Sequence, residues 1–271
     1  MSSNMVAKQR LVATLLGQGK GFTLVEMALV LLIIGLLSKI AIAPLAGMQE
    51  HRKRMQAEQQ LQGVRDAVFS HIVAYGAIPC PLPVLPSGQS VLQPIAMGGA
   101  AYGVSPGRAG LHSADECTVS AGVVPASRLQ LPGAIDASGA LLDPWGNTYR
   151  YAVSLSNSAD TGNDDWPDWT TAGEASAVGI GNLSADLVLC NTAPSGQCRG
   201  RQIRADQIAF VVLSTGADAS GSGMQGENLD NDRYFVVTEE SIEQGNEYDD
   251  IVAWGSAADV MYWMLRMGWL P

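Results

Sequence analysis

Charged side chains and histidines are both scarce in this 271-residue chain. Asp, Glu, Lys and Arg make up 15% of the residues, against about 25% in an ordinary soluble domain, and the histidines number three, His51, His71 and His112. The sequence contains no His-Glu-x-x-His zinc motif and no phosphate-binding loop. Serines and aspartates abound, but no catalytic base accompanies them. These absences predict that the protein is not an enzyme.

Basic residues are also few relative to acidic ones. Sixteen Lys and Arg face 26 Asp and Glu, which gives a formal net charge of -10 and a pI near 4.7. Three of the bases lie within residues 1–21, where there is no acid, so the rest of the chain is more acidic still. Such a charge repels phosphate backbones and disfavours binding to nucleic acid. The hydrophobic content of 47% excludes wholesale disorder.

Only four cysteines are present, and none forms a Cys-x-x-Cys pair, which argues against a zinc site. Four cysteines allow three disulfide pairings. The seven residues between Cys190 and Cys198 favour a local loop closure, which leaves Cys80 to pair with Cys117. We therefore expect two disulfides and no free thiol.

One long apolar run stands near the N-terminus. It extends without interruption over residues 27–37 and, after Ser38 and Lys39, resumes to Met48. A membrane-spanning helix needs about 20 apolar residues, so this segment is just long enough to span a bilayer. A secretory signal peptide has its small-residue cleavage site after the apolar run, whereas here the small residue Gly21 precedes it.

The string Gly21-Phe22-Thr23-Leu24-Val25-Glu26, leading into that run, resembles the processing site of type IV prepilins and type II secretion pseudopilins. The resemblance implies that a membrane peptidase cleaves after Gly21 and methylates the new N-terminus, Phe22. It also implies that Glu26, an expensive charge in apolar surroundings, pairs with the N-terminal amine of Phe22 in a neighbouring subunit. The alternative is a signal anchor whose Glu26 lies at the cytoplasmic interface.

Pro44 also fits this resemblance, because members of the family often carry a proline at or near this distance from the cut. A proline inside a helix removes one hydrogen bond and loosens the preceding turn. In this family, that is a place where the helix unwinds during assembly, so the resemblance assigns Pro44 to subunit assembly. The other interpretation is an ordinary kink.

The helix is predicted to continue beyond the apolar run. Apolar residues recur at helical spacing from Leu61 to Tyr75, and Gly76 and the following prolines then end the helix. The domains expected are a leader (1–21), a transmembrane and assembly helix (22–48), its amphipathic half (49–76) and a globular head (77–271). By the resemblance, the fold class is α+β and pilin-like: a long N-terminal helix, half in the membrane and half amphipathic, packed on an antiparallel sheet with irregular loops pinned by disulfides.

Strands are expected in the head at residues 148–155, 208–213 and 234–238, from alternating or β-branched patterns. The string Asp143-Pro144-Trp145-Gly146-Asn147 before the first of these has the residues of a tight turn. It closely resembles a turn of the major pseudopilin of type II secretion, and we interpret it as structural.

The pattern Ser214-Thr215-Gly216-Ala217-Asp218, followed later by Asp249-Asp250, resembles the C-terminal calcium loop of the same pseudopilin. The resemblance makes Asp218, Asp249 and Asp250 possible calcium ligands, with backbone oxygens from Ser214 and Gly216. The loop is longer than the family pattern. Its excess contains three rival ligands, Asn228, Asp230 and Asp232.

Acids on a surface are common without metal, so a metal-free loop remains the alternative to the calcium site. The sequence has a second acidic stretch, which we interpret as a solvated loop and not as a metal site. It comprises Asp160, Asp164, Asp165 and Asp168. The C-terminal segment 260–271 is densely apolar and is expected to pack back onto the head, with contact to another subunit as the alternative.

Together these features predict a pilin-like structural subunit of a type IV pilus or a type II secretion pseudopilus, and its size suggests a minor one. The resemblance implies three partners: prepilin peptidase, other pilin or pseudopilin subunits, and the inner-membrane assembly platform. It places the chain in the bacterial inner membrane with its head in the periplasm, and then in the filament. Two alternatives stay open: a minor pilin whose head binds a ligand or surface, and a membrane-anchored periplasmic enzyme.

Overall fold

The computed structural model describes residues 23–83, 119–154, 169–170, 173–193, 196–219, 223–230, 232–241 and 247–271. Within residues 37–46 it describes the helical backbone but not the side chains. Several residues singled out in the sequence lie outside these ranges: Gly21, Phe22, Cys117, Asp160, Asp164, Asp165 and Asp168. The chain divides into two compact units, Met1–His51 and Arg52–Pro271.

The first element is α2, a 52-residue helix spanning Leu24–Tyr75. At its start the Thr23 hydroxyl accepts a hydrogen bond from the Glu26 backbone N–H at 3.2 Å, which satisfies one of the amides left free at a helix N-terminus. At its end Gly76 adopts a positive φ of 68° and its N–H donates to Ile72 O. The predicted helix end at about Tyr75 is confirmed.

In the part of the chain that the structure describes, no helix combines the length and the apolar character needed to cross a membrane.

The head, within residues 52–271, contains a six-stranded sheet with strand order β1-β2-β4-β3-β5, and β6 pairs with β4. The strands are β1 (Ala121–Val123), β2 (Arg150–Val153), β3 (Leu187–Cys190), β4 (Ile203–Ser214), β5 (Tyr234–Val236) and β6 (Ile251–Ser256). The three predicted strands are therefore present, although β2 and β5 are shorter than expected. The mixed helix-and-sheet class expected from the sequence is confirmed.

The sheet is mostly antiparallel, as expected, but one pair of strands departs from this expectation. β3 and β5 run parallel, with Val188 opposite Tyr234, whereas the other pairings are antiparallel. Parallel neighbours need a long crossover connection, and here the chain between them contains β4 and α5 (Gly223–Glu227). Sequence patterns within each strand carry no information about this arrangement.

β4 is the central strand and pairs with β2, β3 and β6, and its backbone is irregular at Gln207. Gln207 has a φ of 54°, and the pairing register shifts close to it. The first part of β4 pairs with β3, and the part from Phe210 onward pairs with both β2 and β6.

The main core lies between the second half of α2 and the sheet. Leu61, Val64, Val68 and Ile72 are fully buried at helical spacing. They belong to the same cluster as Tyr149, which precedes β2, and as Tyr151, Val153 and Phe210 of the sheet. The opposite side of the sheet holds a second cluster, which includes Leu189, Val211 and Phe235. Both faces of β4 are consequently covered.

Tyr75, predicted to belong to the buried stripe of α2, is instead 61% exposed. The tryptophan near the C-terminus covers the helix end in its place, since a Cβ on Gly76 would meet the ring of Trp269 at 2.6 Å. The indole N–H of Trp269 donates to Val73 O at 3.0 Å.

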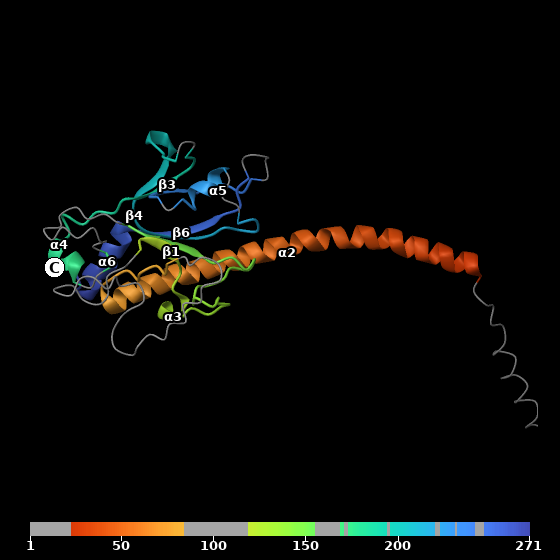
Figure 1. Ribbon diagram of the computed structural model, residues 1–271, viewed down its shortest axis with the longest axis horizontal. Coiled ribbons are helices and arrows are strands. Elements are labelled where there is room, and N and C mark those ends of the chain that lie inside the picture. The colour runs from red at the N-terminus through yellow and green to blue at the C-terminus, as the bar shows by residue number, and fades with distance from the viewer. Residues whose placement is uncertain are drawn as a thin grey trace, which may run out of the picture. The chain divides into compact units, whose positions relative to one another are not determined.

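The C-terminal helix α6 spans Ala257–Met267. It begins with a capping box between Ser256 and Asp259 and ends at Gly268 in the left-handed conformation. Its residues Val260 and Met264 are buried in the main core, and Figure 1 shows α6, in dark blue, beside the C-terminal end of α2. The prediction that this segment packs back onto the head is confirmed for its buried face.

The described residues also form three short elements: α3 (Ala126–Leu129), α4 (Glu174–Val178) and the 3₁₀ turn η1 (Gly200–Gln202).

Candidate functional site

The first candidate is the apolar start of α2. Every side chain from Thr23 to Leu36 is exposed, and the apolar ones include Leu24 at 88% and Leu31 at 69%. Glu26 is the one charged side chain in this segment and is exposed as well. Apolar side chains at this density are ordinarily buried against something. The segment therefore has the character of a contact surface for apolar partners.

Of the residues predicted to act in processing and assembly, the structure describes Glu26 fully and Pro44 only in its backbone, which is helical. Thr23 and Glu26 form a signal that the sequence interpretation missed. A threonine followed three residues later by a glutamate is the pattern of a helix capping box, and the Thr23 hydroxyl does accept from the Glu26 N–H. The string that resembles a processing site is thus also the start of the helix.

The second candidate is the group of loops that meet at the end of β4. The predicted turn at Asp143 is confirmed: its carboxylate accepts from the N–H groups of Trp145 at 3.0 Å and Asn147 at 2.9 Å. The other carboxylate oxygen accepts from the hydroxyl of Ser214 at 2.6 Å. The side-chain amide of Asn147 also donates to Gly216 O at 2.9 Å. The two strings that resemble the pseudopilin are therefore in direct contact.

Asp249 fixes the same loop from the other side. Its carboxylate accepts from the Ala217 N–H at 2.7 Å and from the Gln225 side chain at 2.8 Å. It lies directly against Gly216, whose φ is 65°, so that no side chain fits at that position. Burial is the main cause that raises the pKa of Asp249, and nearby Asp218 adds to it. As a hydrogen-bond acceptor, Asp249 links the loop after β4, at Ala217, to α5, at Gln225.

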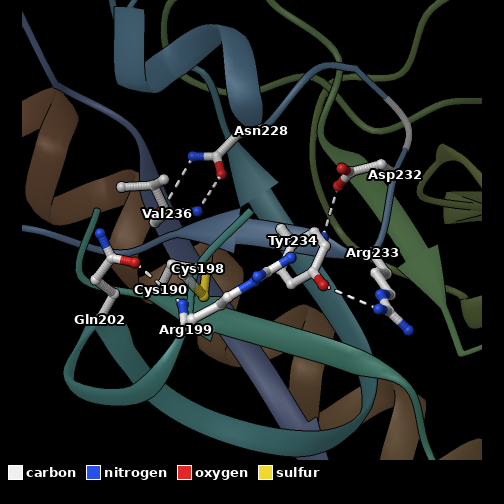
Figure 2. Close-up of a disulfide and its surroundings, with 9 residues drawn as sticks. All are labelled: Cys190, Cys198, Arg199, Gln202, Asn228, Asp232, Arg233, Tyr234 and Val236. Carbon is white, nitrogen blue, oxygen red and sulfur yellow. Dashed lines mark hydrogen bonds between the residues drawn. A yellow bond between two sulfur atoms is a disulfide. The ribbon is translucent and has the colours of Figure 1, made fainter. Parts of the chain in front are cut away.

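Asp250 is the most buried acid of this region, with 4% of its surface exposed. One carboxylate oxygen accepts from the Asn228 side chain at 2.7 Å, and the other is buried without a hydrogen-bond partner. Burial raises the pKa of Asp250 to about 7, against the opposing hydrogen bond from Asn228 and with help from the charges of Asp249 and Asp218. Asn228 also exchanges two hydrogen bonds with the backbone of Val236 in β5 (Figure 2).

A different acidic trio lies close together in this part of the head. Carboxylate oxygens of Glu227, Asp230 and Asp232 all lie within 4.8 Å of one another. Among the described residues, no other group of three acids, cysteines or histidines has its ligand atoms this close together. In particular, Asp218, Asp249 and Asp250 do not form such a group. Calcium at Asp218, Asp249 and Asp250 stays a prediction. Glu227 was missed because nothing in its sequence spacing indicates that the end of α5 faces the two aspartates.

The predicted disulfide between Cys190 and Cys198 is confirmed, and Figure 2 shows it beside Asn228 and Val236. Both cysteines are buried, and they share a small cluster with Val236 and Tyr248. Cys80 is disulfide-bonded too, while its predicted partner Cys117 lies outside the described residues. The described cysteines include no free thiol.

The resemblance to pilins stays a prediction from the sequence, carried by residues 17–50, 143–151 and 208–254. No model of a protein family, no curated protein and no solved structure matches the chain.

Proposed function

We propose that this chain is a pilin-like structural subunit. In this proposal prepilin peptidase cleaves it after Gly21 and methylates Phe22, and its N-terminal helix then assembles into a type IV pilus or a type II secretion pseudopilus, where it is a minor subunit. The observation that carries the proposal is the exposed apolar segment at the start of α2, which directly follows Gly21 and Phe22 and contains the single charge of Glu26.

The apolar segment supports assembly for an energetic reason. Burying apolar surface gains about 25 cal/mol per Å². From Leu24 to Leu36, successive side chains present such surface on all sides of the helix. An element that is apolar all round is buried against lipid or against other helices. Copies of the same helix side by side would satisfy this requirement.

Glu26 gives that assembly its specificity. A carboxylate buried among apolar helices is stable only when a cation pairs with it. The described residues from 23 to 36 contain no basic residue, so the segment does not supply a partner itself. The N-terminal ammonium of a neighbouring subunit, created by cleavage after Gly21, is the cation that the proposal supplies.

The second half of α2 supports the other part of the proposal, a head that moves together with its helix. Besides the apolar core, Arg65 donates from Nε to Trp254 O at 2.8 Å, and Arg54 pairs with Glu240 at 3.2 Å. These contacts attach residues 52–75 to β6 and to the segment after β5. A pilin-like fold, in which the helix carries the head into a filament, needs such an attachment.

The partners in this proposal are prepilin peptidase, other subunits of the filament and the inner-membrane assembly platform. The chain would stand first in the bacterial inner membrane with its head in the periplasm. It would then pass into the filament.

Glu26→Gln tests the assembly step separately from processing. We expect the variant to be cleaved normally but to fall at least about tenfold in a sheared filament fraction, because the neutral amide loses the ion pair. The measurement is the ratio of this chain in filaments to that in membranes. Glu50→Gln is the matched control, since Glu50 is an exposed acid on the same helix outside the apolar segment. Equal recovery of the two variants would contradict the proposal.

A further inference from the structure

The acidic trio at the end of α5 has the composition and spacing of a cation site. It comprises Glu227, the last residue of α5, and Asp230 and Asp232 in the loop that leads into β5. Their oxygens lie within 4.8 Å of one another, which is twice a calcium–oxygen bond of about 2.4 Å. One ion can therefore contact all three carboxylates without a large rearrangement.

Glu227 provides the observation that separates this trio from an ordinary group of surface acids. Only 9% of the surface of Glu227 is exposed, and its Oε1 is buried without a hydrogen-bond partner. A buried carboxylate oxygen without a partner costs free energy unless a proton or a cation compensates it. One of its carboxylate oxygens lies within 4.8 Å of an oxygen of each aspartate, so a cation bound among them would lie against the Glu227 carboxylate.

In the described part of the head, no basic side chain forms an ion pair with the trio. The ion pairs there join Arg54 to Glu58 and Glu240. The nearest base in sequence, Arg233, stacks on the ring of Tyr234 and donates to its hydroxyl at 2.9 Å (Figure 2). The pKa of Asp232 is raised by burial, with the Asp230 carboxylate adding to this, despite the opposing charge of Arg233.

Backbone contacts hold the two aspartates in place while leaving them open to a ligand. Asp230 accepts from the N–H of Asp232 at 3.0 Å through Oδ1, and Asp232 accepts from the N–H of Tyr234 at 2.6 Å through Oδ1. The second carboxylate oxygen of each aspartate takes no part in these two bonds, and both residues are exposed, so water can complete a coordination shell. Glu227 lies near the disulfide-closed loop, where a Cβ on Gly196 would lie 3.8 Å from its Oε2.

We propose that Glu227, Asp230 and Asp232 bind a calcium ion in the head. Three carboxylates form a hard, all-oxygen set, and calcium accepts irregular arrangements of such ligands, whereas magnesium demands near-octahedral geometry and gives up its water reluctantly. The site is separate from Asp218, Asp249 and Asp250. It does not depend on filament assembly.

Calorimetric titration of the purified full chain with calcium chloride, after chelator treatment, tests the proposal. We expect one binding event in the wild type and weaker binding of magnesium. Asp230→Asn removes an exposed ligand that the fold does not need. It should lower calcium affinity by at least the roughly 10- to 100-fold that loss of an outer-shell partner costs. Asp206→Asn, the same change at an exposed position of β4, should bind as the wild type does.

Glu227→Gln gives an independent readout. Without calcium, the neutral amide should raise the melting temperature, because it removes a buried, unpaired charge; with calcium, it should lose the gain that the wild type shows. Asp218→Asn locates the ion, since this change should leave the affinity unaltered. The proposal is overturned if the wild type shows neither heat nor thermal stabilisation with calcium, if Asp230→Asn binds as tightly as the wild type, or if Asp218→Asn alone abolishes binding.

Discussion

At the scale of single residues, Asp250 links the stability of the head to pH. Its pKa in the folded chain is about 7, mainly because of burial, against an ordinary value of about 3.9 in an unfolded chain. Between about pH 4 and pH 7, the Asp250 carboxyl is therefore protonated in the folded chain and ionised in the unfolded chain. The stability contributed by Asp250 is therefore greatest below about pH 4, falls as the pH rises to about 7, and is constant above that.

Asp250→Asn should accordingly stabilise the calcium-free chain at pH 8, by up to about 4 kcal/mol, and flatten its pH dependence between about pH 4 and pH 7. The amide oxygen can still accept the hydrogen bond from Asn228. Urea unfolding at several pH values measures the effect, with Asp206→Asn as the control. A pH dependence as steep as that of the wild type would show that Asp250 is ionised in the folded chain. Glu227, whose pKa burial also raises to about 7, retains a slope of its own in the variant.

Single residues also show where sequence reasoning ends. The turn at Asp143 was predictable, because proline and glycine at their positions require little else. The hydrogen bond from Ser214 to Asp143 was not, because it joins positions 71 residues apart. The same holds for Glu227, whose neighbours are set by the path of the loop after α5 and not by any periodic pattern.

At the scale of elements, long and periodic segments were predictable. The second half of α2 was identified because Leu61, Val64, Val68 and Ile72 follow the period of a helix. β4 was recognised by its β-branched run, although its bend at Gln207 was not. The three-residue strand β1 has too few residues for a pattern. The parallel pairing of β3 with β5 depends on tertiary contacts that no local segment encodes.

The disulfide between Cys190 and Cys198 joins the end of β3 to the loop before β4. Replacing both cysteines by alanine should lower the free energy of unfolding by about 2.5 kcal/mol, because a closed loop of this length restricts the unfolded chain by about that amount. Denaturant unfolding measures the loss, with reduced wild type as the comparison.

Thiol counting on denatured, unreduced wild type should find no free thiol. Two or more free thiols, or an unchanged unfolding free energy, would contradict this account.

At the scale of the whole molecule, the two compact units have different character. Residues 52–271 form a head with a large main core and two smaller apolar clusters, whereas the described side chains at the start of α2 expose apolar surface in every direction. The head buries much of its apolar surface within itself, but the apolar segment needs partners. Its sequence context, with Gly21 and Phe22 before it and Glu26 within it, is the basis on which we propose that those partners are other subunits.

The mass of the N-terminal peptide of the chain, recovered from purified cell membranes, tests this central claim most directly. The account predicts a peptide that begins at N-methylated Phe22, because assembly requires the ammonium group that cleavage after Gly21 creates. An N-terminal peptide that retains the intact leader from Met1 would contradict the account and return the chain to an ordinary anchored protein.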